Sequence, residues 1–217
     1  MTELPFQEYM QGKPCVISAG MMRSASTVLF NTIRFILEEK WGEELVAGWQ
    51  NDIHERGQGS YYLVKTHNLS LWDEIKAEHI FYSYRDIRTA MVSAYKVWNT
   101  QPHIGVVEKY IDEYQRAKER ADLMLPYDAI TKQLPITAML IANILEINIS
   151  PAEITRKMFA INTSDNSAPY DRTTLFAPDH RKLTKDDEWR EVLPRDLQNE
   201  ISGKYGWWFK ECGYPTE

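Results

Sequence analysis

The feature that most constrains the fold of this chain is an alternation of short β-favouring runs with amphipathic helical stretches. Residues 15–19 follow Gly12 and Pro14 and predict a short buried strand. A loop of small residues comes next (20–27), and apolar residues then recur at helical spacing as far as about Lys40. A strand, a short loop and a helix in this order form the unit from which parallel sheets are built.

The same order recurs further along the chain. Strands are predicted at residues 61–64, 80–84 and 123–125, where β-branched, aromatic and other apolar residues cluster. An amphipathic helix carries Met91, Ala94, Tyr95 and Trp98 on one face, and a longer helix extends from about Val107 to Ala121. We therefore expect a mainly parallel sheet between two layers of helices, which is a three-layer α/β/α architecture.

The C-terminal third adds two helices and a long loop. Ser150, with a proline at the first helical position after it, predicts a helix start, and a last helix is expected from about Pro194 to near Gly213. Residues 163–188 are rich in Ser, Thr, Asp, Asn and Pro and predict a surface loop that acts as a lid. With no repeat or linker visible, residues 1–217 are expected to form one domain, with residues 1–13 as an N-terminal extension.

Composition narrows the classes of function. The 217 residues include 25 Lys and Arg against 31 Asp and Glu, a net charge of −6, which argues against a nucleic-acid partner. Cys15 and Cys212 lack the spacing of a thiol metal site, and so few cysteines suit the reducing cytoplasm. No metal is expected, because no acidic residue lies beside the loop 20–27 where it would hold Mg²⁺. The first residues lack the pattern of a signal peptide, and the longest apolar run (136–149) is too short and polar to span a membrane.

Chemistry-bearing residues follow three of the predicted strands. They are the loop 20–27, the segment 65–67 and the segment 85–93. Because parallel α/β sheets bind ligands at the carboxyl ends of their strands, we expect these three segments to surround one site.

The loop after the first strand has the properties of an anion site. A helix N-terminus presents backbone N–H groups and favours negative charge. Ser24, Ser26 and Thr27 add hydroxyl donors, and Arg23 adds a planar charged group that suits phosphate oxygens. The loop is not a Walker loop, because it has no second glycine and no lysine before a hydroxyl residue.

This loop resembles the 5′-phosphosulfate loop of the sulfotransferases, which use 3′-phosphoadenosine 5′-phosphosulfate as sulfuryl donor. The match is Arg23-Ser-Ala-Ser-Thr27 directly after a strand. The resemblance implies the P-loop NTPase-like sulfotransferase fold and assigns Arg23, Ser24, Ala25, Ser26 and Thr27 to donor binding. Ala25 stands where the family usually has glycine, and Val28 stands where many cytosolic members have a tryptophan near the adenine.

The second strand end resembles the family's Lys-Thr-His segment, here Lys65-Thr-His67. In the family the histidine is the catalytic base, so the resemblance implies that His67 takes the proton of the acceptor hydroxyl. A group with a pKa near 6.5 is suited to that step. Lys65 is then expected to neutralise the oxygen that leaves with the phosphate.

The third strand end resembles the family's 3′-phosphate segment. Arg85 follows the strand and Ser93 comes eight residues later, and such a pair can hold one phosphate from two sides. The resemblance also points to Tyr127 near the adenine, and to Arg181 and Lys182 in a loop that closes on the 3′-phosphate. In that loop the family's glycine is replaced by leucine.

The leading hypothesis is thus a sulfotransferase that acts by in-line transfer on a hydroxyl or amine of a small-molecule or carbohydrate acceptor. One alternative is a nucleotide-dependent kinase-like enzyme, for which Asp86 is the one strand-end candidate to hold Mg²⁺. Another is a non-catalytic nucleotide-binding protein of the same fold, against which Lys65 and His67 argue. The sequence leaves open which acceptor is used, whether four tryptophans (41, 49, 72 and 98) line its pocket, and what the oligomeric state is.

Overall fold

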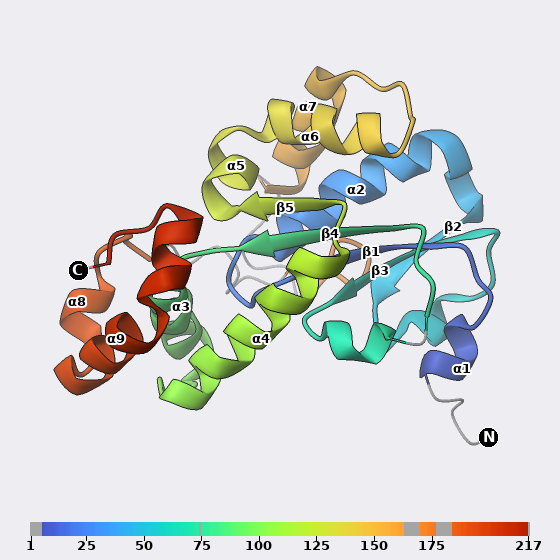
Figure 1. Cartoon of the computed structure of the whole chain (residues 1–217). Coiled ribbons are helices and arrows are strands. Elements are labelled where there is room, and N and C mark those ends of the chain that lie inside the picture. The colour runs from blue at the N-terminus through green and yellow to red at the C-terminus, as the bar shows by residue number, and fades with distance from the viewer. Residues whose placement is uncertain (1–5, 74, 163–169, 177–183, 217) are drawn as a thin grey trace.

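The computed structural model describes residues 6–73, 75–162, 170–176 and 184–216, and it contains a five-stranded sheet with helices on both faces (Figure 1). The strands are β1 (Cys15–Gly20), β2 (Leu45–Trp49), β3 (Tyr61–Thr66), β4 (His79–Tyr84) and β5 (Leu123–Pro126). Their order across the sheet is β2-β3-β1-β4-β5, and each neighbouring pair is parallel. The expected α/β architecture with a parallel central sheet is confirmed.

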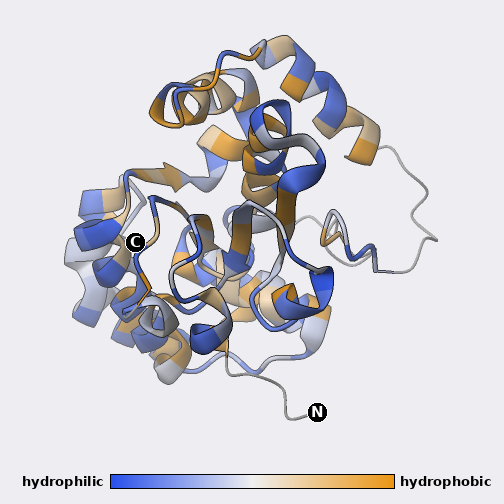
Figure 2. Ribbon diagram, turned by 90° about the vertical axis from the view of Figure 1, so that its right-hand side faces the viewer, coloured by the Kyte–Doolittle hydropathy of each residue, from blue (hydrophilic) through white to orange (hydrophobic). Residues whose placement is uncertain are grey.

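Helices cover the two faces of the sheet. In chain order they are α1 (Phe6–Met10), α2 (Ser26–Trp41), α3 (Ile87–Trp98), α4 (Ile104–Arg120), α5 (Tyr127–Lys132), α6 (Leu134–Ile144), α7 (Pro151–Asn162), α8 (Trp189–Val192) and α9 (Arg195–Cys212), with short 3₁₀ helices η1 (Gly42–Glu44), η2 (Ile53–Arg56) and η3 (Leu69–Trp72). Helices α2, α6 and α7 lie over one face, and α3, α4 and α9 lie over the other (Figure 1). The helices carry hydrophobic residues on part of their surface and hydrophilic residues on the rest (Figure 2).

The central strand β1 separates two apolar cores. Ile17 faces the core shared with α4 and α9, whereas its neighbour Val16 faces the core shared with α2 and α6. All six residues of β1 and all six of β3 are buried. Strands covered on both faces read as continuous apolar runs, which is why the sequence pattern finds them.

Strand β2 was not predicted from the sequence. It lies at the edge of the sheet, its residues alternate between half-buried and buried, and Gly48 interrupts the β-favouring run. Helices α5 and α6 were also not predicted. None of the helices in the described part of the chain is both long and apolar enough to cross a membrane.

The described part of the predicted lid is residues 170–176 and 184–188; residues 163–169 and 177–183, and with them Arg181 and Lys182, lie outside the described residues. The 170–176 segment is bonded to the rest of the fold. Asn31 of α2 donates its side-chain amide to the Thr174 carbonyl at 2.7 Å, and Arg56 of η2 donates to the Arg172 carbonyl at 2.6 Å.

Candidate active site

The loop between β1 and α2 packs closely against the end of β4. A Cβ atom added to Gly20 would lie 2.0 Å from the Ser83 hydroxyl oxygen, so the close approach requires glycine. Ser24 is fully buried, and its hydroxyl lies 2.6 Å from the Met21 carbonyl and 2.7 Å from the Ser83 hydroxyl. Its side chain therefore anchors the loop to β4 and does not line the cavity above it.

The loop backbone leads directly into the start of α2. Arg23 and Ala25 have the left-handed φ angles 65° and 62°, and Ala25 is the N-cap. The first intrahelical bond runs from the Leu29 N–H to the Ala25 carbonyl at 3.0 Å. The N–H groups of Ser26, Thr27 and Val28 precede this first bond and have no intrahelical carbonyl partner, which is the arrangement that binds anions at helix N-termini.

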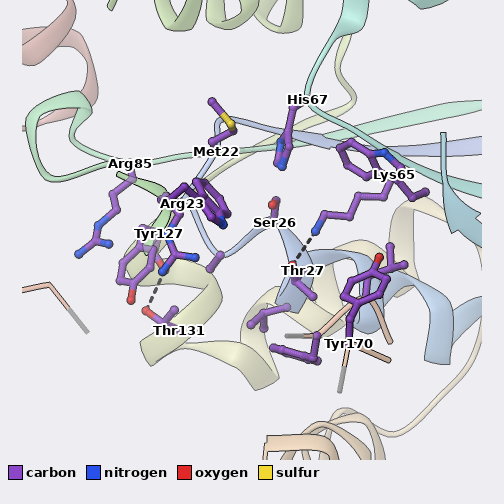
Figure 3. Close-up of a pocket in the computed structure, with 16 residues that line it drawn as sticks. Met22, Arg23, Ser26, Thr27, Lys65, His67, Arg85, Tyr127, Thr131 and Tyr170 are labelled. Carbon is purple, nitrogen blue, oxygen red and sulfur yellow. Dashed lines mark hydrogen bonds between the residues drawn. The ribbon is translucent and has the colours of Figure 1, made fainter. Parts of the chain in front are cut away.

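A cavity of about 460 Å³ opens at the carboxyl ends of β1, β3 and β4 (Figure 3). Side chains from all three strand ends line it, as the sequence predicts. Among the residues that line it are Arg23, Ala25, Ser26, Thr27, Lys65, His67, Arg85 and Tyr127 together with the aromatic residues Trp49, Trp98, Tyr170 and Phe176.

Lys65 enters the cavity from β3 and is buried. Its ammonium group donates to the Thr27 hydroxyl at 2.5 Å, so it lies at the start of α2 (Figure 3). Burial, with a smaller contribution from the charge of Arg23, lowers the pKa of Lys65 to about 7. A bound anion would counter both effects and favour the charged ammonium form.

His67 follows β3, and its ring is oriented by the main chain of β1. Its Nδ1 atom is hydrogen-bonded to the Gly20 carbonyl. Because a carbonyl oxygen can only accept, Nδ1 carries the hydrogen, and in the neutral ring the lone pair is on Nε2. The tautomer with its hydrogen on Nδ1 is the one that a general base acting through Nε2 requires. The ring centroid of His67 lies 5.2 Å from that of Trp49, which also lines the cavity.

Arg85 and Ser93 are both buried, but they contact different groups. The guanidinium of Arg85 lies 4.0 Å from the centre of the Tyr127 ring and donates to the Thr184 carbonyl at 3.2 Å. The Ser93 hydroxyl accepts from Nε of Arg23 at 2.9 Å and is not among the residues that line the cavity. Two groups that the sequence assigns to different phosphates are thus bonded to each other.

Arg88 and Asp86, next to Arg85, form a buried pair. Arg88 donates to the two carboxylate oxygens of Asp86 at 3.0 and 2.6 Å, and it lies between the rings of Trp189 and Phe209. Asp86 also accepts the Arg88 N–H as the cap of α3. This carboxylate is committed to Arg88, which weakens its assignment as a magnesium ligand. Among the described residues, no group of three or more His, Cys, Asp or Glu is arranged to hold a metal.

Several cavity residues were not predicted. Thr131 comes from α5, and Tyr170, Leu175 and Phe176 come from the segment expected as a lid; no local pattern distinguishes them in the sequence. Met22 was part of the predicted loop but not singled out. Of the four candidate tryptophans, 49 and 98 line the cavity, whereas 72 is fully buried in the core and 41 stacks on Tyr61 with centroids 4.5 Å apart.

No model of a protein family matches the chain, and no curated protein matches it in sequence. Among solved structures it is similar to mouse sulfotransferase SULT7A1 complexed with PAP, with 11% identity, a TM-score of 0.66, and 94% of this chain and 88% of that chain covered. It is also similar to retinol dehydratase in a complex with retinol and PAP, with 14% identity, a TM-score of 0.55, and 94% of this chain and 82% of that chain covered. The similarity to retinol dehydratase in complex with androsterone and inactive cofactor PAP has 15% identity, a TM-score of 0.57, and 95% of this chain and 84% of that chain covered. The chain therefore has the fold of the sulfotransferases.

Proposed function

We propose that this protein is a sulfotransferase that moves the sulfuryl group of 3′-phosphoadenosine 5′-phosphosulfate to a hydroxyl or amine of a small-molecule or carbohydrate acceptor. The observation that carries the proposal is the shared cavity, because Arg23, Lys65, His67 and Arg85 reach it from three adjacent strand ends. The three similar solved structures named above were determined with PAP, the desulfated form of that donor.

The 5′ end of the donor binds at the start of α2. The loop amides and the hydroxyls of Ser26 and Thr27 donate to its oxygens, and Arg23 and Lys65 supply positive charge. In this proposal Lys65 also stabilises the bridging oxygen as negative charge develops on it.

The 3′ end of the donor binds near Arg85. The Ser93 hydroxyl of α3 accepts from Arg23 and donates its own hydrogen to that phosphate. Tyr127, which packs on Arg85, lies against the adenosine. Arg181 and Lys182 remain part of the proposal as further 3′-phosphate ligands, although they lie outside the described residues.

In the transfer step, Nε2 of His67 takes the proton of the acceptor hydroxyl while its oxygen attacks sulfur. A new S–O bond forms as the S–O bond to the 5′-phosphate breaks, and the bisphosphate leaves with that bridging oxygen. No covalent enzyme intermediate is involved. The general base is worth about 10²–10⁴ in rate, and positioning of the two substrates supplies much of the remainder.

The unpaired thiols of Cys15 and Cys212 suit a cytoplasmic location.

The test is a transfer assay with ³⁵S-labelled donor and a panel of phenols, alcohols, amines and sugars. His67→Ala should leave the Kd for PAP unchanged while transfer falls by about 10²–10⁴. Arg85→Ala should raise that Kd by about 10–100-fold, because charged hydrogen bonds to phosphate are lost. His103→Ala and Arg156→Ala, at exposed positions outside the cavity, are the matched controls and should change neither quantity.

Two outcomes would contradict the proposal at different levels. Transfer at the wild-type rate by His67→Ala would remove the base assignment alone. A wild-type protein that neither binds PAP nor transfers sulfate to any acceptor in the panel would overturn the function.

A further inference from the structure

A cavity much smaller than the candidate active site is also lined by His67. Its volume is about 20 Å³, and it is lined by Met21, Met22, His67, Lys109, Tyr110 and Glu113. The large cavity is lined by His67 and Met22 as well, so the histidine lies between the two cavities. The wall opposite the β1–α2 loop is formed by α4, which contributes three of the six residues.

The small cavity is bordered by two methionines as well as by polar side chains, and its volume leaves room for one water molecule. The Tyr110 side chain is only 4% exposed, and its hydroxyl has no hydrogen-bond partner within the described ranges. A hole of this volume holds a single water when two or more polar groups surround it, and buried hydroxyls are nearly always hydrogen-bonded. Tyr110, Glu113 and His67 provide such groups.

Glu113 links α4 to the turn that carries His67. Its carboxylate accepts the backbone N–H of Leu69 at 2.7 Å, two residues after the histidine. The side chain is 9% exposed, and burial raises its pKa, against the opposing charges of Arg116 and Lys109. Burial of a carboxylate destabilises the fold unless the group is hydrogen-bonded or paired with an opposite charge.

We propose that Glu113 is a positioning residue for His67. Its carboxylate holds the turn that carries the ring and, acting across the small cavity through one water, stabilises the protonated ring that forms during transfer. The inference rests on the proposed role of His67 as the general base. The Gly20 carbonyl, which accepts from Nδ1, acts in the same direction as Glu113.

Other charged groups around the ring act in the opposite direction. Lys109 lines the same small cavity, and Arg23 and Lys65 line the large one. Asp112, next to Glu113 on α4, points to solvent, so its effect on the ring is screened. A negative charge at Glu113 therefore favours the protonated ring of His67, whereas the positive charges of Lys109, Arg23 and Lys65 disfavour it.

The direct test is an NMR titration of the His67 ring in the whole protein. Glu113→Gln keeps an oxygen that can accept from Leu69 but removes the charge, and it should lower the pKa of His67 by about one unit. Asp112→Asn removes a neighbouring exposed carboxylate and should leave the pKa of His67 unchanged. Lys109→Gln removes a cation from the cavity rim and should raise the pKa of His67.

The result that overturns the proposal is an unchanged pKa of His67 in a folded Glu113→Gln variant. Should that variant not fold, Lys109→Gln decides the question, since Lys109 is exposed and its replacement leaves the core intact. No rise in the pKa of His67 with Lys109→Gln would then overturn the proposal.

Activity supplies a second readout that a purely structural role would not produce. In Glu113→Gln the acidic limb of the kcat/KM profile should move to lower pH by the same interval as the pKa of His67. The titration needs no turnover, so a failure of this coupling is distinguishable from a failure of the sulfotransferase proposal, which the PAP-binding and transfer assays report.

Discussion

At the residue scale, backbone strain marks the loop between β1 and α2. Ala25 has φ 62° and ψ 24°, a left-handed conformation that costs an L-residue about 1–2 kcal/mol. The sulfotransferase loops that this loop resembles usually carry glycine at this position. The structure gives the reason, since only glycine adopts this conformation without cost.

Ala25→Gly should therefore stabilise the protein. Relief of strain outweighs the larger entropy of glycine in the unfolded chain, and the net gain should be about 0.5–1 kcal/mol. For a chain of this length we expect the melting temperature to rise by about 2 °C, measured by calorimetry. Ala152→Gly, at an exposed helical position of α7, is the matched control and should lower stability by a similar amount. A loss of stability in both variants would show that Ala25 is not strained.

Lys65 predicts a pH dependence for binding of PAP. Its pKa is about 7 in the ligand-free protein, against 10.5 for an ordinary lysine, and a bound phosphate raises it again. Above pH 7 binding must therefore take up a proton, so the Kd should rise by up to about tenfold per pH unit between pH 7 and 9. The bisphosphate itself is fully ionised in this range, because its second ionisation lies near pH 6.

Calorimetry in buffers of different ionisation enthalpy measures this proton uptake directly. In Lys65→Met the uptake and the slope should disappear, and a slope that persists would assign the proton to another group.

Folding stability depends on pH in the opposite direction to PAP binding. Because the pKa of Lys65 is lower in the folded state, the folded chain binds fewer protons, and its contribution to stability rises with pH between about 7 and 10.5.

At the element scale, the sequence predicts four of the five described strands, including the edge strand β5, and misses β2 at the other edge. Strands β1 and β3 are buried throughout and β4 is buried except at its two ends, so most of their residues are apolar or aromatic, whereas β2 alternates and contains Gly48. Local spacing also pairs Arg85 with Ser93 on the following helix. It does not reveal that the Ser93 hydroxyl accepts from Arg23, 70 residues earlier, because that contact depends on how α3 packs beside the loop.

The packing of α3 on α8 and α9 depends on Arg88, which is fully buried between Trp189 and Phe209. Arg88→Ala leaves the Asp86 carboxylate without its buried partner and should cost about 3–5 kcal/mol in urea denaturation. Arg88→Lys should recover little of this loss, because an ammonium group cannot replace the planar guanidinium between two rings. Arg116→Ala, an exposed ion pair with Asp73, should cost about 0–1 kcal/mol. Equal effects of the two alanine variants would contradict a structural role for Arg88.

At the scale of the whole molecule, the site exists because β1 lies between β3 and β4. This order brings Arg23, His67 and Arg85 to one edge of the sheet although they are far apart in the chain. The rule that parallel strands present ligands at their carboxyl ends predicts a shared edge, but strand order is set by packing. For the same reason the wall formed by residues 170–176 has no local signal, since its place depends on bonds to α2 and η2.

The same arrangement predicts which nucleotide stabilises the fold. At a concentration 100-fold above its Kd, PAP should add about 2.7 kcal/mol to the free energy of unfolding. For a chain of this length, that corresponds to a rise of about 5–10 °C in the melting temperature. ATP with Mg²⁺ should give little or no rise, because the loop lacks the Walker lysine and the Asp86 carboxylate is held by Arg88. Arg85→Ala should reduce the rise that PAP produces, measured against the melting temperature of the same variant without ligand. A larger shift with ATP and Mg²⁺ than with PAP would favour the kinase-like alternative, and equal small shifts with both would leave the cavity without its proposed ligand.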